Sequence, residues 1–457
     1  MTHEIDTADA RPIRQPLRRY PPSHQEAIDQ QVSDMLRQGV IEPASSPWAS
    51  NVVLAKKKDG TLRCCINYRQ LNEVTRKDAY PLPRIDACLD AMAGSGIFST
   101  FDLRSGFHQV AMEQRDADKT AFRTRRGIFR FRTMPFGLCN ATASFQRLMD
   151  LVLSGLNLEI CIAYLDDVIL FSRTTEEHLE RPDLVLQRLE DANLKLKPSK
   201  CCSMQTRVTF LGHIVSGEGL ATDPEKIQLV KDWPTPTTLR HVRCFLGLTG
   251  YYRKFLKDYA KTATPLTSLM KKDHRFIWTQ GCQMAFDTLK QALLSPPVLA
   301  LPNDVDTFIL DTDAAEDSIG CVLSQVQDGQ ERVTAYAGRT LNRNELNYCV
   351  TRKELLAIVY FTKHFLQYLL GRQFFIRTDH AALSWLQKKP ELIGQNARWL
   401  ELLAEYDFVI KHRAGKSHGN ADSISRHPCL NKPSCTACHV NSVRIAKIGR
   451  ASCRERV

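Results

Sequence analysis

The sequence predicts an α+β region followed by a separate α/β domain, and three features of the residue pattern support this. Strand-like apolar runs and hairpins predominate up to about residue 220. A helical pattern with many basic residues follows from Asp223 to Leu294, and strand and helix patterns alternate again after Pro296 and Pro297. The chain has 457 residues, which at about 150 residues per domain suits roughly three compact units.

The composition is that of a folded, water-soluble protein, because 43% of the residues are hydrophobic and 25% are charged. No stretch reaches the roughly 18 apolar residues of a membrane span, so no membrane contact is expected. Residues 1–10 contain no presequence pattern, which predicts a cytoplasmic protein. The 15 cysteines are scattered, so we expect reduced thiols. The net charge of +12 and the pI near 9.0 are compatible with a nucleic-acid partner.

The N-terminal segment, residues 1–45, is rich in proline and arginine, so we expect it to be extended and solvated. Within it, Glu26–Gly39 has apolar residues on one side and predicts a short amphipathic helix. Two strand-like runs, Asn51–Ala55 and Thr61–Ile66, then flank Lys56–Lys58. They predict a hairpin with a basic tip.

Two adjacent acids, Asp166 and Asp167, interrupt the apolar run from Glu159 to Ser172. This pattern predicts a β-hairpin that holds two carboxylates at its tip. Such neighbours repel and raise each other's pKa unless a cation neutralises them, so we prefer a metal site to the alternative of an ordinary acidic turn. A third acid, Asp102, follows the strand-like run Ile97–Phe101. Carboxylates on neighbouring strands suit a pair of Mg²⁺ ions.

The sequence around these acids resembles the reverse transcriptases of gypsy-type LTR retrotransposons. The segments that match, in the family's order, are Leu62–Asn72, Phe101–Phe107, Met134–Gly137, Tyr164–Asp167 and Phe210–Gly212. The match runs from about Arg11 to Arg426. The resemblance implies a right-hand polymerase, with fingers and palm in residues 46–220 and a thumb or connection in residues 221–295.

The resemblance also implies catalytic roles. Asp102, Asp166 and Asp167 would hold two Mg²⁺ ions, with Mn²⁺ as an alternative metal. Phe107 would stack under the incoming sugar and exclude a 2′-hydroxyl. Phe136 would line the nucleotide pocket.

Further substrate contacts follow from the same resemblance. Lys57 and Arg63 would meet the triphosphate of the nucleotide, because ammonium and guanidinium donors suit phosphate. The alternative for both is an ordinary solvated hairpin face. Tyr164 belongs to the active-site segment, and Leu211 and Gly212 belong to the turn that would grip the primer strand.

The chain departs from the family pattern at two positions. Asn67 stands where the family usually has aspartate, but it is outside the metal set, so we expect little effect. Pro182 interrupts the helix expected over Thr175–Asp191. A proline inside a helix costs about 3 kcal/mol, so we expect a kink there unless the proline falls in the first turn.

Four more acids lie in the C-terminal part, each on or beside a predicted element. Asp313 ends a strand, Glu354 lies on a long helix over Thr351–Leu370, Asp379 ends a further strand, and Asp422 opens the last helix. A helix cap or a solvated face would explain any one of them alone. The side chains that we expect this helix to bury, with Glu354 at their edge, are Leu355, Ile358, Val359, Thr362, Leu366 and Leu369.

The order of these four acids resembles retroviral and retrotransposon ribonuclease H. The resemblance implies an α/β ribonuclease-H-like domain over residues 296–427, in which the four acids hold two metal ions and cleave the RNA strand of a hybrid. Asp311 shares a face with Asp313 and is treated as ancillary. His418 is left outside the site, since a loop histidine is more often solvated.

Together these features predict an RNA-directed DNA polymerase with ribonuclease H activity that replicates an LTR retrotransposon. Its partners would be an RNA template, a DNA primer, an RNA–DNA hybrid and dNTPs. The family polyprotein also carries a protease and an integrase, so we expect a larger polyprotein and assembly in virus-like particles. The alternatives are a copy that only binds nucleic acid, or a non-LTR or group II intron polymerase. The retained acids and the order of the segments argue against them.

The last residues, 428–457, form a tail outside the predicted domains. Cys435 and Cys438 make a single CxxC pair, which is a weak signal for zinc. Residues 448–457 resemble a translated library adapter and are excluded from the fold prediction. The sequence leaves the oligomeric state open.

Overall fold

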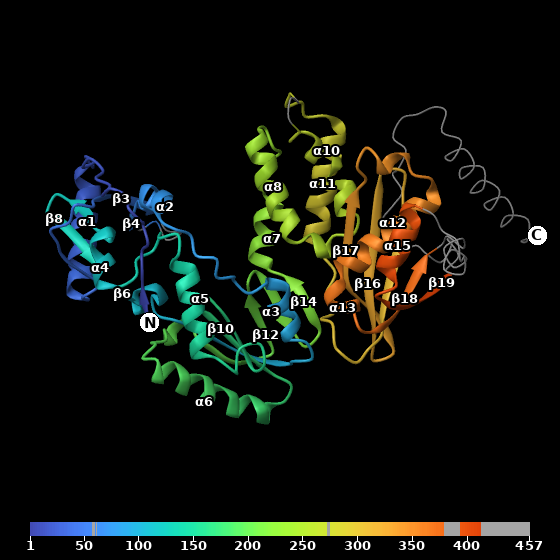
Figure 1. The fold of residues 1–457 in the computed structure, drawn as a ribbon, viewed down its shortest axis with the longest axis horizontal. Helices are drawn as coiled ribbons and strands as arrows, with labels where there is room; N and C mark the ends of the chain where they lie inside the picture. Colours follow the sequence, from blue (N-terminus) through green and yellow to red (C-terminus); the bar gives the residue numbers. More distant parts are fainter. Residues whose placement is uncertain (57–59, 61, 272–274, 379–393, 413–457) are drawn as a thin grey trace, which may run out of the picture. The chain divides into compact units, whose positions relative to one another are not determined.

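The computed structural model describes residues 1–457 with the exception of 57–59, 61, 272–274, 379–393 and 413–457 (Figure 1). The chain divides into two compact units, Met1–Leu220 and the part that begins at Ala221. The domain boundaries predicted above stay predictions. The residues singled out in the sequence that lie outside the described ranges are Lys57, Asp379, His418, Asp422, Cys435 and Cys438.

The N-terminal part of the first unit contains a five-stranded sheet and one long helix. The strand order is β2 (Ile41–Pro43), β8 (Gly127–Phe131), β7 (Phe122–Thr124), β3 (Ser50–Lys56) and β4 (Leu62–Ile66). Helix α1 (Pro22–Arg37) buries Ile28 and Val32 in one apolar cluster with Phe122 and Phe129. The predicted helix and the predicted β3–β4 hairpin are confirmed.

The first residues of the chain are buried, so the expectation of a solvated N-terminal segment is wrong for them. Strand β1 (Thr2–His3) pairs in parallel with β6 (Ala111–Met112), and the Ile5 N–H donates to the Asp116 carboxylate at 2.9 Å. His3 and Ile5 are 1% and 2% exposed. Alternate residues point inward, and the proline-rich and arginine-rich composition of the whole segment conceals this period of two.

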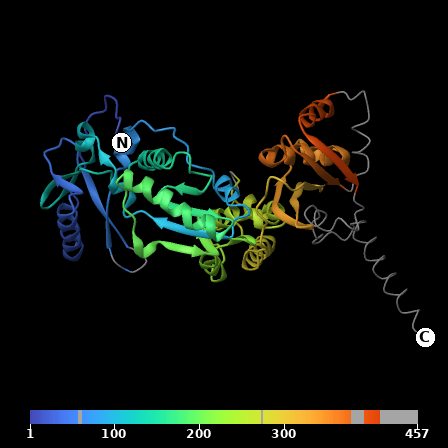
Figure 2. The same cartoon turned by 90° about the horizontal axis from the view of Figure 1, so that it is seen from below.

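The first unit also contains the sheet that carries the paired acids. Its strand order is β11 (Cys202–Gln205), β5 (Ile97–Asp102), β10 (Asp167–Ser172) and β9 (Cys161–Tyr164), all antiparallel. Helices α5 (Ala141–Val152) and α6 (Thr175–Asp191) pack against it, and Figure 2 shows the green helix α6 lying along the strands. The predicted hairpin with two acids at its tip is therefore confirmed.

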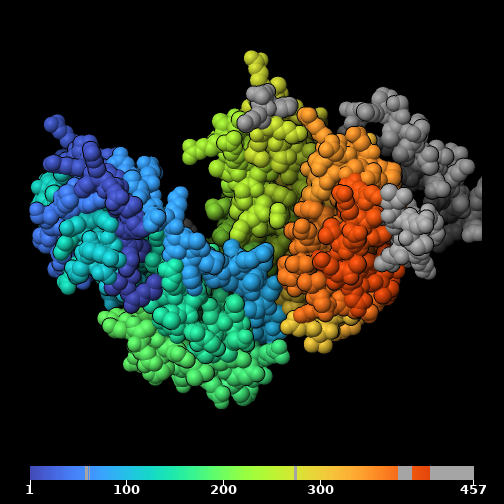
Figure 3. Space-filling view, viewed as in Figure 1, coloured from blue at the N-terminus to red at the C-terminus, as the bar shows by residue number. Residues whose placement is uncertain are grey.

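Helix α6 continues through Pro182. Pro182 lies in the helix interior, where its ring nitrogen cannot donate to the carbonyl of His178. On the inner face, Val185 and Leu189 are buried, whereas the outer face is open to solvent (Figure 3) and carries Leu179 at 64% exposure. Burial of the inner face therefore outweighs the local cost of the proline.

Shorter elements complete the first unit. They are α2 (Arg69–Val74), α3 (Ile85–Ala91), η1 (Gly106–Gln109), α4 (Gln114–Ala117), η2 (Asp118–Thr120) and η3 (Pro198–Lys200). A three-stranded sheet follows in the order β12 (Arg207–Phe210), β13 (His213–Ser216) and β14 (Gly219–Thr222). The turn between β12 and β13 consists of Leu211 and Gly212.

The second unit begins with a group of helices, as the pattern from Asp223 to Leu294 predicts. They are α7 (Pro224–Lys231), α8 (Leu239–Tyr251), η4 (Arg253–Phe255), α9 (Tyr259–Thr262), α10 (Thr264–Ser268) and α11 (Gln280–Leu294). Helices α8 and α11 meet through Phe245 and Phe286, whose ring centroids lie 4.6 Å apart.

A five-stranded sheet forms the rest of the second unit. Its order is β17 (Gln330–Thr340), β16 (Ser318–Gln327), β15 (Phe308–Ala314), β18 (Gln373–Thr378) and β19 (Asp407–His412). Strands β15 and β18 are parallel, and β15 and β16 are antiparallel. Helix α15 (Gln395–Leu403) follows β18 in the chain. Strand β16 was not predicted, because its first eight residues are all buried and show no alternation.

The predicted long helix over Thr351–Leu370 is interrupted. It forms α12 (Val350–His364) and α13 (Leu366–Leu369), because Phe365 leaves the helical conformation and turns its ring into the core at 4% exposure. Leu366 is consequently 42% exposed instead of buried, and Val359 is half-buried. The other expected core positions are buried.

Two expectations about the whole chain can be compared with the described residues. Every cysteine among them is a free thiol, as expected. None of the helices in the described ranges has both the length and the apolar character needed to cross a membrane.

Candidate active sites

The strand register brings two of the predicted acids side by side. Strand β5 ends at Asp102 and strand β10 begins at Asp167, and these two residues are direct partners in the antiparallel ladder. Opposite partners in such a ladder have their Cβ atoms about 5 Å apart. On its other side Asp167 is paired with Tyr164 of β9. Asp166 occupies the connecting turn, where its carbonyl accepts the Leu103 N–H at 3.2 Å.

A buried glutamine holds the turn that carries Asp166. Leu165 has a φ of +56°, in the left-handed region that costs a non-glycine residue about 1–2 kcal/mol. Its N–H donates to the Oε1 atom of Gln146 at 2.9 Å, and Gln146 Nε2 donates to the Ala163 carbonyl at 3.0 Å. Gln146 lies on α5 and is fully buried. It therefore fixes both sides of the strained turn.

Close packing against a glycine fixes Asp166 from the other direction. A Cβ atom added at Gly106 would lie 3.1 Å from the Cβ of Asp166 and 2.9 Å from Cζ of Phe145. Both distances are tighter than ordinary contacts, so a side chain at this position would force Phe145 or Asp166 to shift.

The paired acids open into a cleft of about 270 Å³. Its lining residues are Thr100, Phe101, Asp102, Asp167, Val168, Lys200, Thr209, Phe210 and Leu211. Leu211 and Gly212 have φ values of +47° and +74°, so the β12–β13 turn is tight. The structure thus places the predicted primer turn beside two of the predicted metal ligands.

Lys200 supplies positive charge inside this cleft. Its Nζ atom lies 2.7 Å from Oδ2 of Asp102. Burial raises the pKa of Asp167, the negative charges of Asp166 and Asp102 raise it further, and the Lys200 ammonium opposes them. The hydrogen bond to Asp102 and the surrounding carboxylates raise the pKa of Lys200 itself.

The residues expected to contact the nucleotide form an aromatic group. The ring centroids of Phe107 and Phe136 are 5.1 Å apart, and the Arg63 guanidinium lies 4.5 Å from the Phe136 ring centre. Phe107 also contacts Phe145, with ring centroids 5.4 Å apart. The structure therefore gathers Arg63, Phe107 and Phe136.

The second group of acids lies in the second unit. Asp313 on β15 and Glu354 on α12 are 4% and 2% exposed. They are linked through the backbone, because the N–H of Ala314 donates to Oε1 of Glu354 at 3.1 Å. Asp311 forms an ion pair with Arg377 at 3.7 Å, which gives it a structural role beside the site.

Two family models match the chain. The model for reverse transcriptase (RNA-dependent DNA polymerase) matches residues 55–215, and the model for the RNase H-like domain found in reverse transcriptase matches residues 303–406. The Retrovirus-related Pol polyprotein from transposon 297 of Drosophila melanogaster is 42% identical over 433 residues, covering 93% of this chain and 40% of the relative. Over most of its length the chain is similar to retrotransposon Pol polyproteins. It spans less than half the length of this Pol relative.

Solved structures confirm the fold of the chain as a right-hand polymerase followed by a ribonuclease-H-like domain. The foamy viral protease-reverse transcriptase dRH in complex with double-stranded DNA has a TM-score of 0.81 at 21% identity, over 90% of this chain and 73% of that chain. The foamy viral protease-reverse transcriptase in complex with an RNA/DNA hybrid has a TM-score of 0.76 at 20% identity, over 95% and 58% of the two chains.

The acids of the candidate polymerase site fit a divalent cation by their chemistry. Carboxylate oxygens are the usual ligands of Mg²⁺ and Mn²⁺, and a cation between Asp102 and Asp167 would relieve their mutual repulsion. As they stand, no group of three or more His, Cys, Asp or Glu side chains in the described residues is placed to hold a metal ion.

Sequence reasoning missed two residues of the polymerase site. Gln146 could have been suspected, because it is a polar residue among the apolar residues of α5, the helix before the acidic hairpin. Nothing in the local sequence marks Lys200 as part of the site. It lies 98 positions after Asp102, and it is one of several lysines in its segment.

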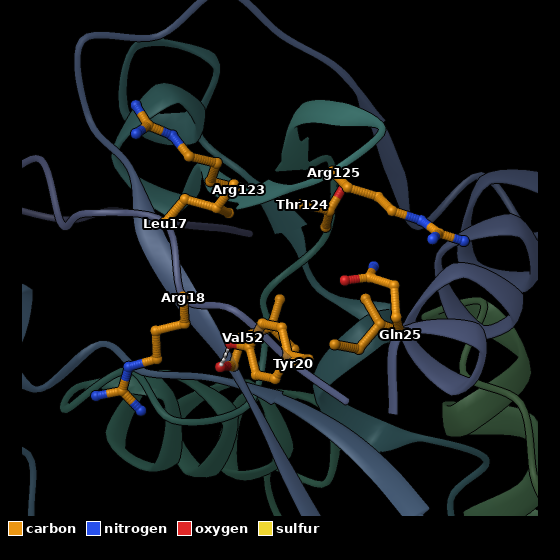
Figure 4. A pocket seen from close by; sticks show the side chains of 9 residues that line it. Leu17, Arg18, Tyr20, Gln25, Val52, Arg123, Thr124 and Arg125 are labelled. Carbon is orange, nitrogen blue, oxygen red and sulfur yellow. Dashed lines mark hydrogen bonds between the residues drawn. The ribbon is translucent and has the colours of Figure 1, made fainter. Parts of the chain in front are cut away.

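A second cavity lies in the N-terminal part of the first unit, and its arginines do not form a phosphate site. Figure 4 shows the guanidinium groups of Arg18, Arg123 and Arg125 pointing away from the cavity. Inside it, the Tyr20 hydroxyl donates to the Val52 carbonyl. The cavity is therefore a packing gap between the segment before α1 and the sheet.

Proposed function

We propose that this Pol segment is an RNA-directed DNA polymerase with ribonuclease H activity that replicates an LTR retrotransposon. The observation that carries the proposal is the ladder pairing of Asp102 with Asp167, with Asp166 in the adjoining turn and Leu211 lining the same cleft. The carboxylates, the aromatic group and the β12–β13 turn correspond to the three needs of nucleotide addition. These are a place for metal ions, for a nucleotide and for a primer end.

In the polymerase site, Asp102, Asp166 and Asp167 would hold two Mg²⁺ ions, or Mn²⁺ in their place. Such ions activate the primer 3′-hydroxyl and stabilise the leaving pyrophosphate. Gln146 fixes the turn of Asp166, so that the carboxylate geometry is set before substrate binds.

The remaining residues of this site would select and orient substrates. The Phe107 ring would lie under the incoming sugar and leave no room for a 2′-hydroxyl, with Phe136 lining the same pocket. Arg63 and Lys57 would bind the triphosphate through charge-assisted hydrogen bonds. Tyr164, Leu211 and Gly212 would position the primer end beside the acids.

In the ribonuclease H site, Asp313 and Glu354 would act with Asp379 and Asp422. The four acids would hold two metal ions that activate water for cleavage of the RNA strand. Strand β18 runs parallel to β15 and ends at Thr378, and Asp379 is the next residue in the sequence.

The proposed partners are an RNA template, a DNA primer, an RNA–DNA hybrid and dNTPs. The net charge of +12 and the fold shared with foamy viral enzymes that were solved with double-stranded DNA and with an RNA/DNA hybrid support them. We further propose that the segment acts in the cytoplasm within virus-like particles, as part of a polyprotein with a protease and an integrase.

Extension of a DNA primer on an RNA template, with Mg²⁺ and the four dNTPs, tests the proposal. The wild-type chain should synthesise DNA, and Asp166→Asn should not. Absence of synthesis by folded wild-type protein would contradict the proposal and favour a segment that only binds nucleic acid.

A further inference from the structure

The position of Lys200 is fixed by the backbone of the strand that carries the first acid. The Lys197 N–H donates to the Asp102 carbonyl at 2.8 Å, and the Arg104 N–H donates to the Lys195 carbonyl at 2.9 Å. These bonds align the residues before η3 with the end of β5. The short η3 turn then places Lys200 over the carboxylate.

The Lys200 side chain is held by charge and is otherwise accessible. It is 56% exposed, whereas the Asp102 side chain that it contacts is 19% exposed. A flexible lysine stem at this exposure can swing into solvent without disturbing the core. The carboxylate, in contrast, stays at the strand end.

One ammonium cannot satisfy this cluster. Asp102, Asp166 and Asp167 carry three negative charges when ionised, and Lys200 offers a single positive charge as a hydrogen-bond donor. A divalent ion carries twice that charge and draws several oxygens into one shell. The ammonium and the metal therefore compete for the same oxygens of Asp102.

We propose that Lys200 is the resident counter-ion of the polymerase carboxylates and that a metal ion binds by displacing it from Asp102. The inference rests on the proposed function, because it assumes that these acids bind metal. Lys200 keeps the metal affinity of the nucleotide-free site low, and the triphosphate, which brings its own charge and oxygens, favours loading of the metal with the nucleotide.

A titration of the full chain with Mn²⁺ in the absence of nucleotide tests the displacement of Lys200. The electron paramagnetic resonance signal of free Mn²⁺ reports how much of the ion is bound. The portion of binding that is lost in Asp167→Asn defines the polymerase site. Lys200→Gln should lower the dissociation constant of that portion about tenfold, because a competing unit charge has been removed. Lys200→Arg keeps the charge and should bind like wild type.

Lys197→Gln is the matched control, since it removes the same charge three positions away and retains the backbone hydrogen bond to Asp102. It should change the dissociation constant less than about twofold. Thermal unfolding checks that each variant is folded, and Lys200→Met replaces Lys200→Gln if the latter is not. An unchanged or weaker affinity in Lys200→Gln would overturn the inference and leave the proposed function intact. If the wild-type chain shows no Mn²⁺ binding that depends on Asp167 and also fails to extend primers, both the inference about Lys200 and the proposed function are overturned.

Discussion

The two groups of acids differ in what faces their negative charge. In the first unit, Asp102 faces a flexible ammonium group in an open cleft. In the second unit, Asp313 and Glu354 are almost fully buried, and a backbone N–H donates to Glu354. A lysine side chain can leave its partner, but a backbone group cannot. The first cluster is therefore built for exchange of its cation, and the second for rigid placement of its carboxylates.

A change at Gly106 should damage the first cluster alone. In Gly106→Ala the new Cβ would meet Phe145 and Asp166, so the carboxylate must shift. Misplacement of a reacting group by about 1 Å can cost a hundredfold in rate, so we expect primer extension to fall by about that factor. Hybrid cleavage should be unchanged.

The matched control for Gly106 is Gly96→Ala, where nothing lies within 4 Å of the added Cβ. It should retain extension within about twofold. Equal losses of extension and cleavage in Gly106→Ala would indicate general unfolding, and the separation of the two clusters would then be unsupported.

Removal of the Gln146 amide should destabilise the first unit. Gln146→Leu leaves the Leu165 N–H and the Ala163 carbonyl without their buried partner, so the free energy of unfolding should fall by about 3 kcal/mol. Denaturant titration measures this change. The kcat of extension should fall more than KM changes, because the turn of Asp166 loosens.

Gln187→Leu on the exposed face of α6 provides the comparison for Gln146, since its amide bonds only to the nearby Asp191 in the described residues. Its unfolding free energy should change by less than about 0.5 kcal/mol. If both variants lost equal stability, the burial of Gln146 would not be the cause.

Replacement of Pro182 should stabilise the first unit. Pro182→Ala restores an N–H that can donate to the His178 carbonyl and removes the ring clash, so we expect a gain of about 2 kcal/mol in unfolding free energy. The measurement is again denaturant unfolding, with the neighbouring exposed Asp183→Ala as control. A loss of stability would mean that α6 depends on the proline ring for packing.

Acidification should lower the stability of the region around His3 in the first unit and raise the stability of the region around Asp258 in the second unit. Burial lowers the pKa of His3 from 6.5 to about 4, so its contribution to stability is present above pH 6.5 and is lost as the pH falls toward 4. Burial raises the pKa of Asp258 from 3.8 to about 6, so its contribution is present at low pH and is lost as the pH rises through 6.

Hydrogen exchange at pH 7 and pH 5 can follow both units in the full chain. From pH 7 to pH 5, the free energy of opening measured near β1 and β6 should fall by on the order of 1–2 kcal/mol. The free energy of opening near α9 should rise. His3→Gln and Asp258→Asn should each reduce the pH dependence of their own region. The same sign of change in both regions of the wild type would contradict this assignment.

Local patterns in the sequence predicted most of the fold near the polymerase acids. The hairpin around Asp166 was predictable because apolar strands on both sides isolate two charges in a turn. The hairpin of β3 and β4 was predictable in the same way, because two strand-like runs flank a short charged segment. Strand β16 was not, because burial on both faces removes the alternation that marks a strand. The break at Phe365 was hidden, since Leu366 and Leu369 continue a helical spacing.

Contacts between distant parts of the chain explain what the sequence could not predict about the site. Asp102 and Lys200 meet only because β5 and η3 are joined by backbone bonds. Gln146 acts on a turn that follows it by 19 positions. Motif resemblance identifies residues that react, whereas these residues position or neutralise them and are recognised from geometry.

One assay tests most directly that two separate groups of acids perform two reactions. A hybrid substrate with a labelled DNA primer and a differently labelled RNA template reports extension and RNA cleavage in the same tube. The account predicts both reactions in wild type, cleavage alone in Asp166→Asn, and extension alone in Glu354→Gln. Loss of both reactions in either folded variant, or extension that survives in Asp166→Asn, would contradict it.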